Sequence, residues 1–350
     1  MSTIEKVPIF VVGATGYIGG SVLSRLLAHP GAKDYDITAI VRNQEKAKKL
    51  ESFGVKTVVG TFEEYDKLED LASRAHVVFS MADSDNLPAM QAIIRGLRKR
   101  HATVNDLPIL IHTSGTSLLN DDAKGLYTTE VIYDDSNADQ MNSIPDNALH
   151  RNVDLAVVNA DKEGYLRSYI IIPSTIYGIA RNKLVDAGIV NPHSIQIPYL
   201  IKASLDRKQA GVVGKGVSYW PDVHIDDVAD LYIVLFNAIV ADPNKVDHGD
   251  NGYYFGENGE HTWFDISQAI GQAMFELGIS KSSEPTTFTS QELLKYYGTE
   301  EVSPYCGSNS RARGTHSRSP GWKPKYTTKD MIASIKPEVE VILKRQGGKA

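Results

Sequence analysis

Three glycines near the start of the chain have the spacing of a turn that holds a phosphate group. Gly13, Gly16 and Gly19 follow the apolar residues 9–12, and residues 21–28 after them have helical spacing. Gly13 permits a tight turn, Gly16 lets the backbone approach a pyrophosphate, and Gly19 lets the helix pack closely on a sheet. We therefore expect this turn to bind the diphosphate of a dinucleotide at the helix N-terminus. The alternative is a turn with a structural role only. The other contacts expected from this turn are Thr15, Tyr17 and Ile18.

A positive charge stands where the type of dinucleotide is selected. The second apolar run ends at Val41 and is followed by Arg42, with Lys46 one turn into the next helical stretch. A site selective for NAD places an acidic residue there, against the ribose hydroxyls. A guanidinium can instead pair with a 2′-phosphate, so the sequence predicts NADP(H) as the cofactor. The alternative is a solvated arginine at the end of a strand.

The elements that must position these residues alternate along the chain. Short β-branched runs separated by amphipathic stretches indicate βαβ units, and nearly continuous apolar character indicates a parallel sheet covered on both faces. We predict an α/β fold with a doubly wound parallel Rossmann sheet of about seven strands. The expected strands are residues 7–12, 36–41, 55–59, 76–82, 109–112, 169–172 and 253–255.

Residues outside these strands predict a second, smaller part. We expect a dinucleotide-binding domain of residues 1–178 and 223–256, and a discontinuous α+β substrate domain of residues 179–222 and 257–350. Periodicity fails between residues 115 and 147, which indicates a long loop over the strand ends. Loops of this length in a compact domain are usually lids or binding segments.

Composition excludes several classes of function. The chain has 350 residues and a formal net charge of −6, so a nucleic acid is not an expected partner. The longest apolar run, residues 231–240, is too short to span a membrane, and no secretory signal precedes the first strand. A single cysteine, Cys306, forms no internal disulfide and no zinc site. We expect a cytoplasmic protein without a metal, acting on a small molecule.

Four further motifs, together with the glycine turn, resemble the extended short-chain dehydrogenase/reductases, which include NAD-dependent epimerases, dehydratases and fungal-type reductases. The motifs stand in the family's order and span nearly the whole chain. They are residues 109–116 (ILIHTSGT), 172–178 (IPSTIYG), 223–230 (VHIDDVAD) and 321–324 (GWKP).

The resemblance implies roles for residues in these motifs. Pro173, Ser174, Thr175 and Ile176 would pass the nicotinamide and orient its carboxamide, although plain strand-exit residues would look the same. Further cofactor contacts implied are Met81, Ala82, Thr113 and Ser114. His224, Asp226 and Asp227 are expected to cap and anchor a helix. Relatives often form homodimers, which is compatible with this chain, but no sequence feature selects a face.

The chain departs from the family at its catalytic pair. Members that transfer hydride use a tyrosine as acid or base and a lysine four residues later that lowers its pKa. Counting back from Pro173 places these positions at Asp146 and His150, and no Tyr-x-x-x-Lys occurs between Gly115 and Pro173. Gly115 falls at the usual catalytic serine, with Ser114 and Thr116 beside it.

His150 is the residue that we expect to take over proton transfer. Imidazole titrates near neutrality, so His150 could supply or relay a proton, assisted by the hydroxyls of Ser114 and Thr116. The alternative is a solvent-exposed first-turn histidine beside an ion pair of Arg151 with Asp154. Further candidates are Tyr133 and Tyr127 on the long loop.

Three functions compete on this evidence. The leading hypothesis is an NADPH-dependent oxidoreductase that reduces a carbonyl or other polarised double bond of a small metabolite. The alternatives are a non-catalytic NADP(H) sensor, which would explain the missing pair, and a nucleotide-sugar epimerase or dehydratase. Trp322 and the basic residues Arg311, Arg313 and Arg318 could contact a phosphorylated substrate or form a solvated surface.

Overall fold

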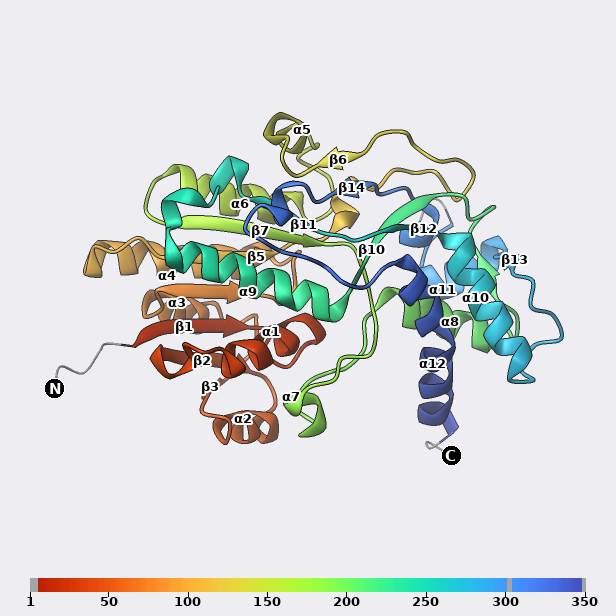
Figure 1. Cartoon of the computed structure of the whole chain (residues 1–350), viewed down its shortest axis with the longest axis horizontal. Helices are drawn as coiled ribbons and strands as arrows, with labels where there is room; N and C mark the ends of the chain where they lie inside the picture. The colour runs from red at the N-terminus through yellow and green to blue at the C-terminus, as the bar shows by residue number, and fades with distance from the viewer. Residues whose placement is uncertain (1–5, 301–303, 348–350) are drawn as a thin grey trace.

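A seven-stranded parallel sheet forms the centre of the computed structural model, which describes residues 6–300 and 304–347. Its strands lie in the order β11-β7-β5-β4-β1-β2-β3 (Figure 1). All six ladders that join them are parallel. The strands are β1 (Val7–Val12), β2 (Tyr35–Val41), β3 (Lys56–Val59), β4 (Val77–Ser80), β5 (Ile109–Thr113), β7 (Arg167–Pro173) and β11 (Tyr253–Gly256).

The predicted fold class is confirmed, because each strand of this sheet coincides with an expected apolar run. The inner strands show why the runs are so continuous: every residue of β4 and β5 is buried. A strand that is covered on both faces has no solvent side on which polar residues can alternate. Expected and observed strand ends differ by at most a few residues.

Helices cover both faces of the sheet and create two separate cores. One core contains Leu23, Leu50 and Phe236, and the other contains Leu68, Ile93 and Val157. The helices of the first face are α1 (Tyr17–Ala28), α2 (Gln44–Glu51) and α9 (Ile225–Ala241). Those of the second face are α3 (Tyr65–Ser73), α4 (Leu87–Val104) and α6 (Arg151–Lys162).

A third core lies beyond the carboxyl ends of the strands, on the right of Figure 1. Ile201, Trp220, Trp263 and Ile335 are buried in it, so it joins segments that are far apart in the sequence. Its helices are α8 (Gln196–Asp206), α10 (Trp263–Glu276), α11 (Ser290–Tyr297) and α12 (Thr328–Gly347). The strands beside it are β8 (Thr175–Tyr177), β9 (Gly211–Val212), β10 (Tyr219–His224), β12 (Glu260–Thr262) and β13 (Thr286–Thr287).

The expected long loop carries short elements of its own. It contains β6 (Tyr133–Asp134) and α5 (Ala138–Asn142), and β6 pairs with β14 (Ala312–Arg313). The short helix α7 (Lys183–Asp186) lies in the later excursion between β8 and α8. The long loop is therefore tied to the C-terminal segment by backbone hydrogen bonds.

In the part of the chain that the structure describes, no helix has both the length and the apolar character that crossing a bilayer requires. The cytoplasmic location and the homodimer stay predictions.

Candidate active site

A cleft of about 930 Å³ lies at the carboxyl ends of the central strands. It follows β1, β2, β4, β5 and β7 and is closed on its far side by residues 191–196 and Trp220. In parallel sheets of this kind ligands bind at the strand ends, where the strand order reverses. The strand order reverses at β1, between β2 and β4, and the glycine turn follows β1.

The glycine turn requires its glycines for steric reasons. Gly13 has φ +88°, and a Cβ there would lie 2.5 Å from the carbonyl oxygen of Met81. A Cβ on Gly19 would lie 2.2 Å from the carbonyl oxygen of Gly13. Gly16 lines the cleft and Gly19 does not, so Gly19 acts through close packing of the helix on the turn.

The N-terminus of α1 has free donors that face the cleft. Its cap residue, Gly16, has no side chain that could bond the first-turn N–H groups, and no acidic residue occupies that turn. The first-turn amides are thus available to an anion. The Tyr17 hydroxyl donates elsewhere, to the carbonyls of Tyr177 and Gly178, and anchors the helix against the strand after β7. Tyr17 itself lines the cleft, and so do Thr15 and Ile18.

Arg42 and Lys46 lie at the β2 end of the cleft. Arg42 is exposed, and neither side chain forms an ion pair with another residue in the described ranges. Asn43 caps α2 through the N–H of Lys46 and fixes the start of that helix. Two unneutralised cations at this position can receive a phosphate.

The predicted contacts around the nicotinamide end also meet in the cleft, with one exception. Met81, Ala82, Thr113, Ser114 and Thr116 line it after β4 and β5, and Pro173, Ser174 and Ile176 line it after β7. Thr175 does not: its side chain is fully buried and its Oγ1 has no hydrogen-bond partner in the described structure.

His150 lies in the cleft at the cap of α6. Its Nδ1 is 2.7 Å from Oδ1 of Asp85 and 3.1 Å from Oγ of Ser84. Its Nε2 is 3.2 Å from the place where a Cβ on Gly115 would stand. The missing side chain at Gly115 therefore makes room for the imidazole ring.

The alternative environment expected for His150 is wrong. Arg151 and Asp154 are both buried and are not paired with each other as a surface ion pair. Arg151 donates to the hydroxyl of Tyr253 at 2.9 Å. The Ser114 hydroxyl donates a hydrogen bond to Oδ2 of Asp154, with 2.9 Å between the two oxygens. Ser114 has thus used its single donor and can only accept a hydrogen bond from a ligand.

Tyr133 and Tyr127 are not brought to the cleft. Tyr133 lies in β6 with its backbone paired to β14, and Tyr127 is exposed on the loop. Neither lines the cavity that contains His150. Asp146, the position that the family spacing gave to the tyrosine, does not line it either.

The structure adds residues that the sequence did not single out. Asp83, Ser84 and Asp85 line the cleft after β4, and their place at the end of a predicted strand was a signal that could have found them. His193 comes from the excursion after β8, and its Nδ1 is 2.6 Å from Oε1 of the buried Glu338 on α12. No sequence spacing connects His193 with Glu338.

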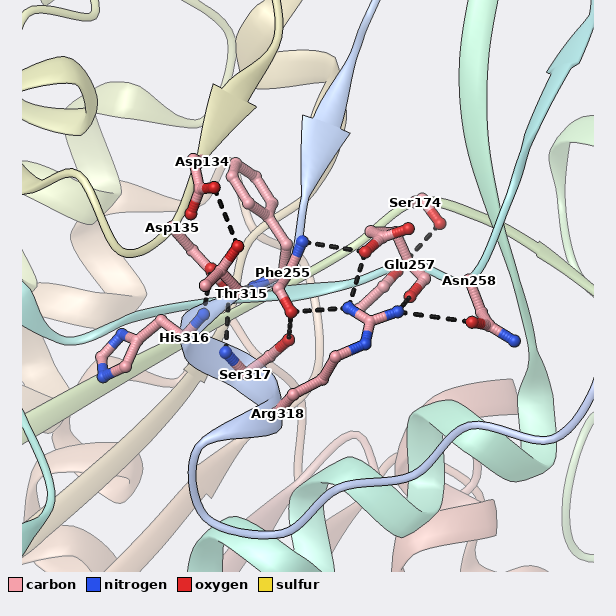
Figure 2. A network of polar contacts seen from close by, with 12 residues as sticks. Asp134, Asp135, Ser174, Phe255, Glu257, Asn258, Thr315, His316, Ser317 and Arg318 are labelled. Carbon is pink, nitrogen blue, oxygen red and sulfur yellow. Dashed lines mark hydrogen bonds and ion pairs between the residues drawn. The ribbon is translucent and has the colours of Figure 1, made fainter.

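Two of the three arginines singled out near the C-terminus form ion pairs, and the third, Arg313, is exposed. Arg311 pairs with Glu260, and Arg318 donates to Glu257 Oε1 at 2.7 Å. In Figure 2 Arg318 points toward Glu257 and Asn258. Arg311 and Arg318 are therefore neither plainly solvated nor free for a phosphate.

Asp135 anchors the same segment from the other side. Its carboxylate accepts three backbone N–H groups, from Phe255, His316 and Ser317 (Figure 2). Such donors favour the charged form, but burial outweighs them and raises the pKa of Asp135 to about 6. The anchor thus carries a group that titrates just below neutrality.

The late motifs prove structural. His224 caps α9 by accepting the N–H of Asp226 at 3.2 Å. Asp227 accepts the backbone N–H groups of Lys325 and Tyr326, and its carbonyl oxygen accepts the indole N–H of Trp322. The residues 321–324 are thereby tied to the start of α9, and none of them lines the cleft.

Known proteins match this chain in sequence and in fold. Residues 5–97 match the NmrA-like family. Oxidase ucsJ of Acremonium sp is 29% identical over 97% of this chain and 98% of its own. A Stigmatella aurantiaca ketoreductase of a farnesylated dihydroquinoline oxide is 29% identical over 32% of this chain and 34% of its own. The Bacillus anthracis dTDP-glucose 4,6-dehydratase, solved with NAD, has a TM-score of 0.62 and 15% identity, with 97% of each chain covered.

This chain has a Rossmann fold similar to that of the solved epimerases and dehydratases. Its residues 5–97 are similar to the NmrA-like family, and a relative named an oxidase is similar to almost its whole length. The fold similarity extends over both the sheet and the segments beyond it.

Proposed function

We propose that the chain is an NADPH-dependent oxidoreductase that reduces a carbonyl or other polarised double bond of a small metabolite. One observation carries the proposal. A single cleft joins the glycine turn and two unpaired cations at one end to the imidazole of His150 at the other. The division into residues 1–178 with 223–256 and residues 179–222 with 257–350 belongs to the proposal, with the substrate bound between the two parts.

The cofactor half of the cleft suits a dinucleotide. The uncapped first turn of α1 offers amides to the diphosphate, and Gly16 keeps side chains away from it. Arg42 and Lys46 would bind the 2′-phosphate, which is the reason for naming NADP(H) and not NAD(H). Bound NADPH would supply a hydride at the nicotinamide.

The residues of the other half handle the proton. His150 Nε2 faces the space beside Gly115, where a substrate oxygen can stand, and a protonated ring can donate there as the oxygen gains negative charge. Ser114 accepts a hydrogen bond from an N–H or O–H group of the ligand, because its own proton is held by Asp154. Thr116 has a buried hydroxyl without a partner among the described residues, which can complete the contacts.

The charges in the substrate half argue against a nucleotide-sugar substrate. Among the described residues, the positively charged side chains that line the cleft are those of Arg42 and Lys46. Both lie at the β2 end. The loop near His150 contributes Asp83 and Asp85 instead. A second diphosphate would find no cation to neutralise it there, so we favour an uncharged substrate over the epimerase or dehydratase reaction.

The test measures NADPH consumption with a panel of uncharged aldehydes, ketones and conjugated enones. We expect turnover with part of the panel. His150→Gln should lower kcat by about 10²–10⁴-fold at unchanged NADPH affinity, the range that a general acid supplies. His101→Gln is the matched control, because this histidine lies at the far end of α4.

A sensor is the competing function, favoured by the absence of Tyr-x-x-x-Lys. Tight NADPH binding without turnover on the whole panel, and with a ligand-dependent change of shape in solution scattering, would support the sensor and contradict the reductase.

A further inference from the structure

The imidazole of His150 is held by the loop that joins β4 to α4. Oδ1 of Asp85 lies 2.7 Å from Nδ1, and Oγ of Ser84 lies 3.1 Å from the same atom. The His150 side chain is 11% exposed, whereas the Asp85 side chain is 50% exposed. One ring nitrogen is therefore committed to the loop, and the ring itself is largely enclosed.

The Asp85 contact determines which nitrogen carries the proton. An ionised carboxylate can only accept a hydrogen bond, so at 2.7 Å the hydrogen must sit on Nδ1 of the ring. The Ser84 hydroxyl can accept or donate, so it adapts to whichever state the ring adopts. A neutral His150 must then have its lone pair on Nε2.

The other nitrogen is directed at the cleft. Nε2 makes no hydrogen bond within the described residues and lies next to Gly115, where a Cβ would stand 3.2 Å away. A side chain at residue 115 would cover this atom. The same ring therefore has one nitrogen fixed by the protein and one available to a ligand.

The backbone of His150 is in a conformation that needs support. Its φ is 68° and its ψ is −21°, in the left-handed region that residues other than glycine adopt only with strain. Contacts made by the ring must offset that strain. Asp85 provides the shortest of these contacts.

We propose that Asp85 is a positioning residue that holds the proton on Nδ1 of His150 and so makes Nε2 the atom that exchanges a proton with the substrate. This inference rests on the proposed function, which assigns the proton transfer to His150. In reduction, the Nε2–H bond of the protonated ring breaks and a new O–H bond forms on the substrate oxygen, while the hydride joins the carbon. The ring is left neutral with its hydrogen on Nδ1, bonded to Asp85, and water restores the proton on Nε2.

The direct test needs no substrate. Nitrogen NMR of the protein labelled at histidine, at a pH where the ring is neutral, reports which nitrogen carries hydrogen. The His150→Gln spectrum assigns the signal among the ten histidines. We expect the Nδ1–H form for His150 in the wild type and a mixture or the Nε2–H form in Asp85→Ala. An Nε2–H form in the wild type would overturn the proposal.

A matched control exists at another Asp–His contact. Nδ1 of His76 lies 2.8 Å from Oδ2 of Asp106, far from the cleft. Asp106→Asn should change the His76 signal and leave both the His150 signal and turnover unchanged. A change of the His150 signal in this variant would mean that the ring responds to general loosening of the fold. That result would contradict the positioning role of Asp85.

Kinetics then separate this inference from the proposed function. Asp85→Asn and Asp85→Ala should lower kcat about tenfold or more with little change in KM or in NADPH affinity, and Asp85→Glu should recover part of kcat. Full activity in Asp85→Ala overturns the positioning role. Full activity in His150→Gln instead overturns the proposed proton transfer, whatever the NMR result on the tautomer.

Discussion

The two halves of the cleft are built in different ways. The proposed cofactor half relies on backbone groups of the turn after β1, with steric demands at Gly13 and Gly19, and adds the two cations Arg42 and Lys46. The substrate half consists of side chains from distant segments, including Asp85, His150 and His193. Backbone amides can bind a phosphate whatever the surrounding side chains, whereas the chemistry of the second half depends on side-chain identity and on long-range contacts.

The largest effect should come from the steric core of the cofactor half. In Gly13→Ala the new methyl group would meet the Met81 carbonyl at 2.5 Å in a backbone conformation with φ +88°. We expect NADPH affinity to fall by about 100-fold or more, since strain of this kind costs about 1–3 kcal/mol before the clash is added. Calorimetry measures the loss.

Gly54→Ala provides the matched control for this variant. Gly54 also has a positive φ, +84°, but nothing lies within 4 Å of its added methyl group. It should lose some stability and keep its cofactor affinity. Equal loss of affinity in both variants would show that the turn needs only general rigidity.

The next effect tests the choice of cofactor. Arg42→Ala should weaken NADPH binding by roughly 10- to 100-fold, since a hydrogen bond to a charged group contributes about 1.5–3 kcal/mol. NADH binding should change little, and so should both affinities in Lys48→Ala, an exposed residue of α2 that does not line the cleft. Equal loss of NADPH and NADH affinity in Arg42→Ala would refute the phosphate contact.

A smaller effect concerns Asp135, whose carboxylate binds the backbone of the C-terminal segment. The raised pKa of Asp135, about 6 in the folded state, lies above its unfolded value near 3.8, so folding favours the protonated form. The free energy of unfolding should therefore fall as pH rises from about 4 to 7, by roughly 1–3 kcal/mol. Urea unfolding of the wild type and of Asp135→Asn measures this free energy. The value for the wild type minus the value for the variant should fall as the pH rises over that range. A constant difference would contradict the raised pKa.

The smallest effect concerns the space beside His150. In Gly115→Ala the new methyl group would approach Nε2 to 3.2 Å, which requires the ring to shift by a few tenths of an ångström. We expect kcat to fall about three- to tenfold with unchanged NADPH affinity, because misplacement of a proton donor lowers the rate without touching the other half. An unchanged kcat would mean that the substrate oxygen binds elsewhere.

The fold and most of the residues that line the proposed cofactor half could be predicted from the sequence, because their signals are local. Apolar runs marked every strand of the main sheet, and Gly13, Gly16 and Gly19 marked the turn. Thr175 shows the limit of such predictions. Its position follows the motif, yet its side chain is buried outside the cleft.

The substrate half was predicted only in part. His150, Ser114 and Thr116 do meet in the cleft, while Tyr133 lies elsewhere because β6 is drawn to β14. The ion pair expected between Arg151 and Asp154 failed because burial gave each a different partner, Tyr253 and Ser114. Helical spacing predicts which residues share a face but not what covers that face.

The sequence by itself determined the order of strands and helices, the glycine turn after β1 and the cations at the end of β2, because periodicity, glycine stereochemistry and charge act over short stretches of chain. The tertiary structure alone decided that Asp85 contacts His150, that Asp154 accepts a hydrogen bond from Ser114, and that Glu338 contacts His193. These contacts join residues up to 145 positions apart, and packing of the three cores, not local preference, brings them together.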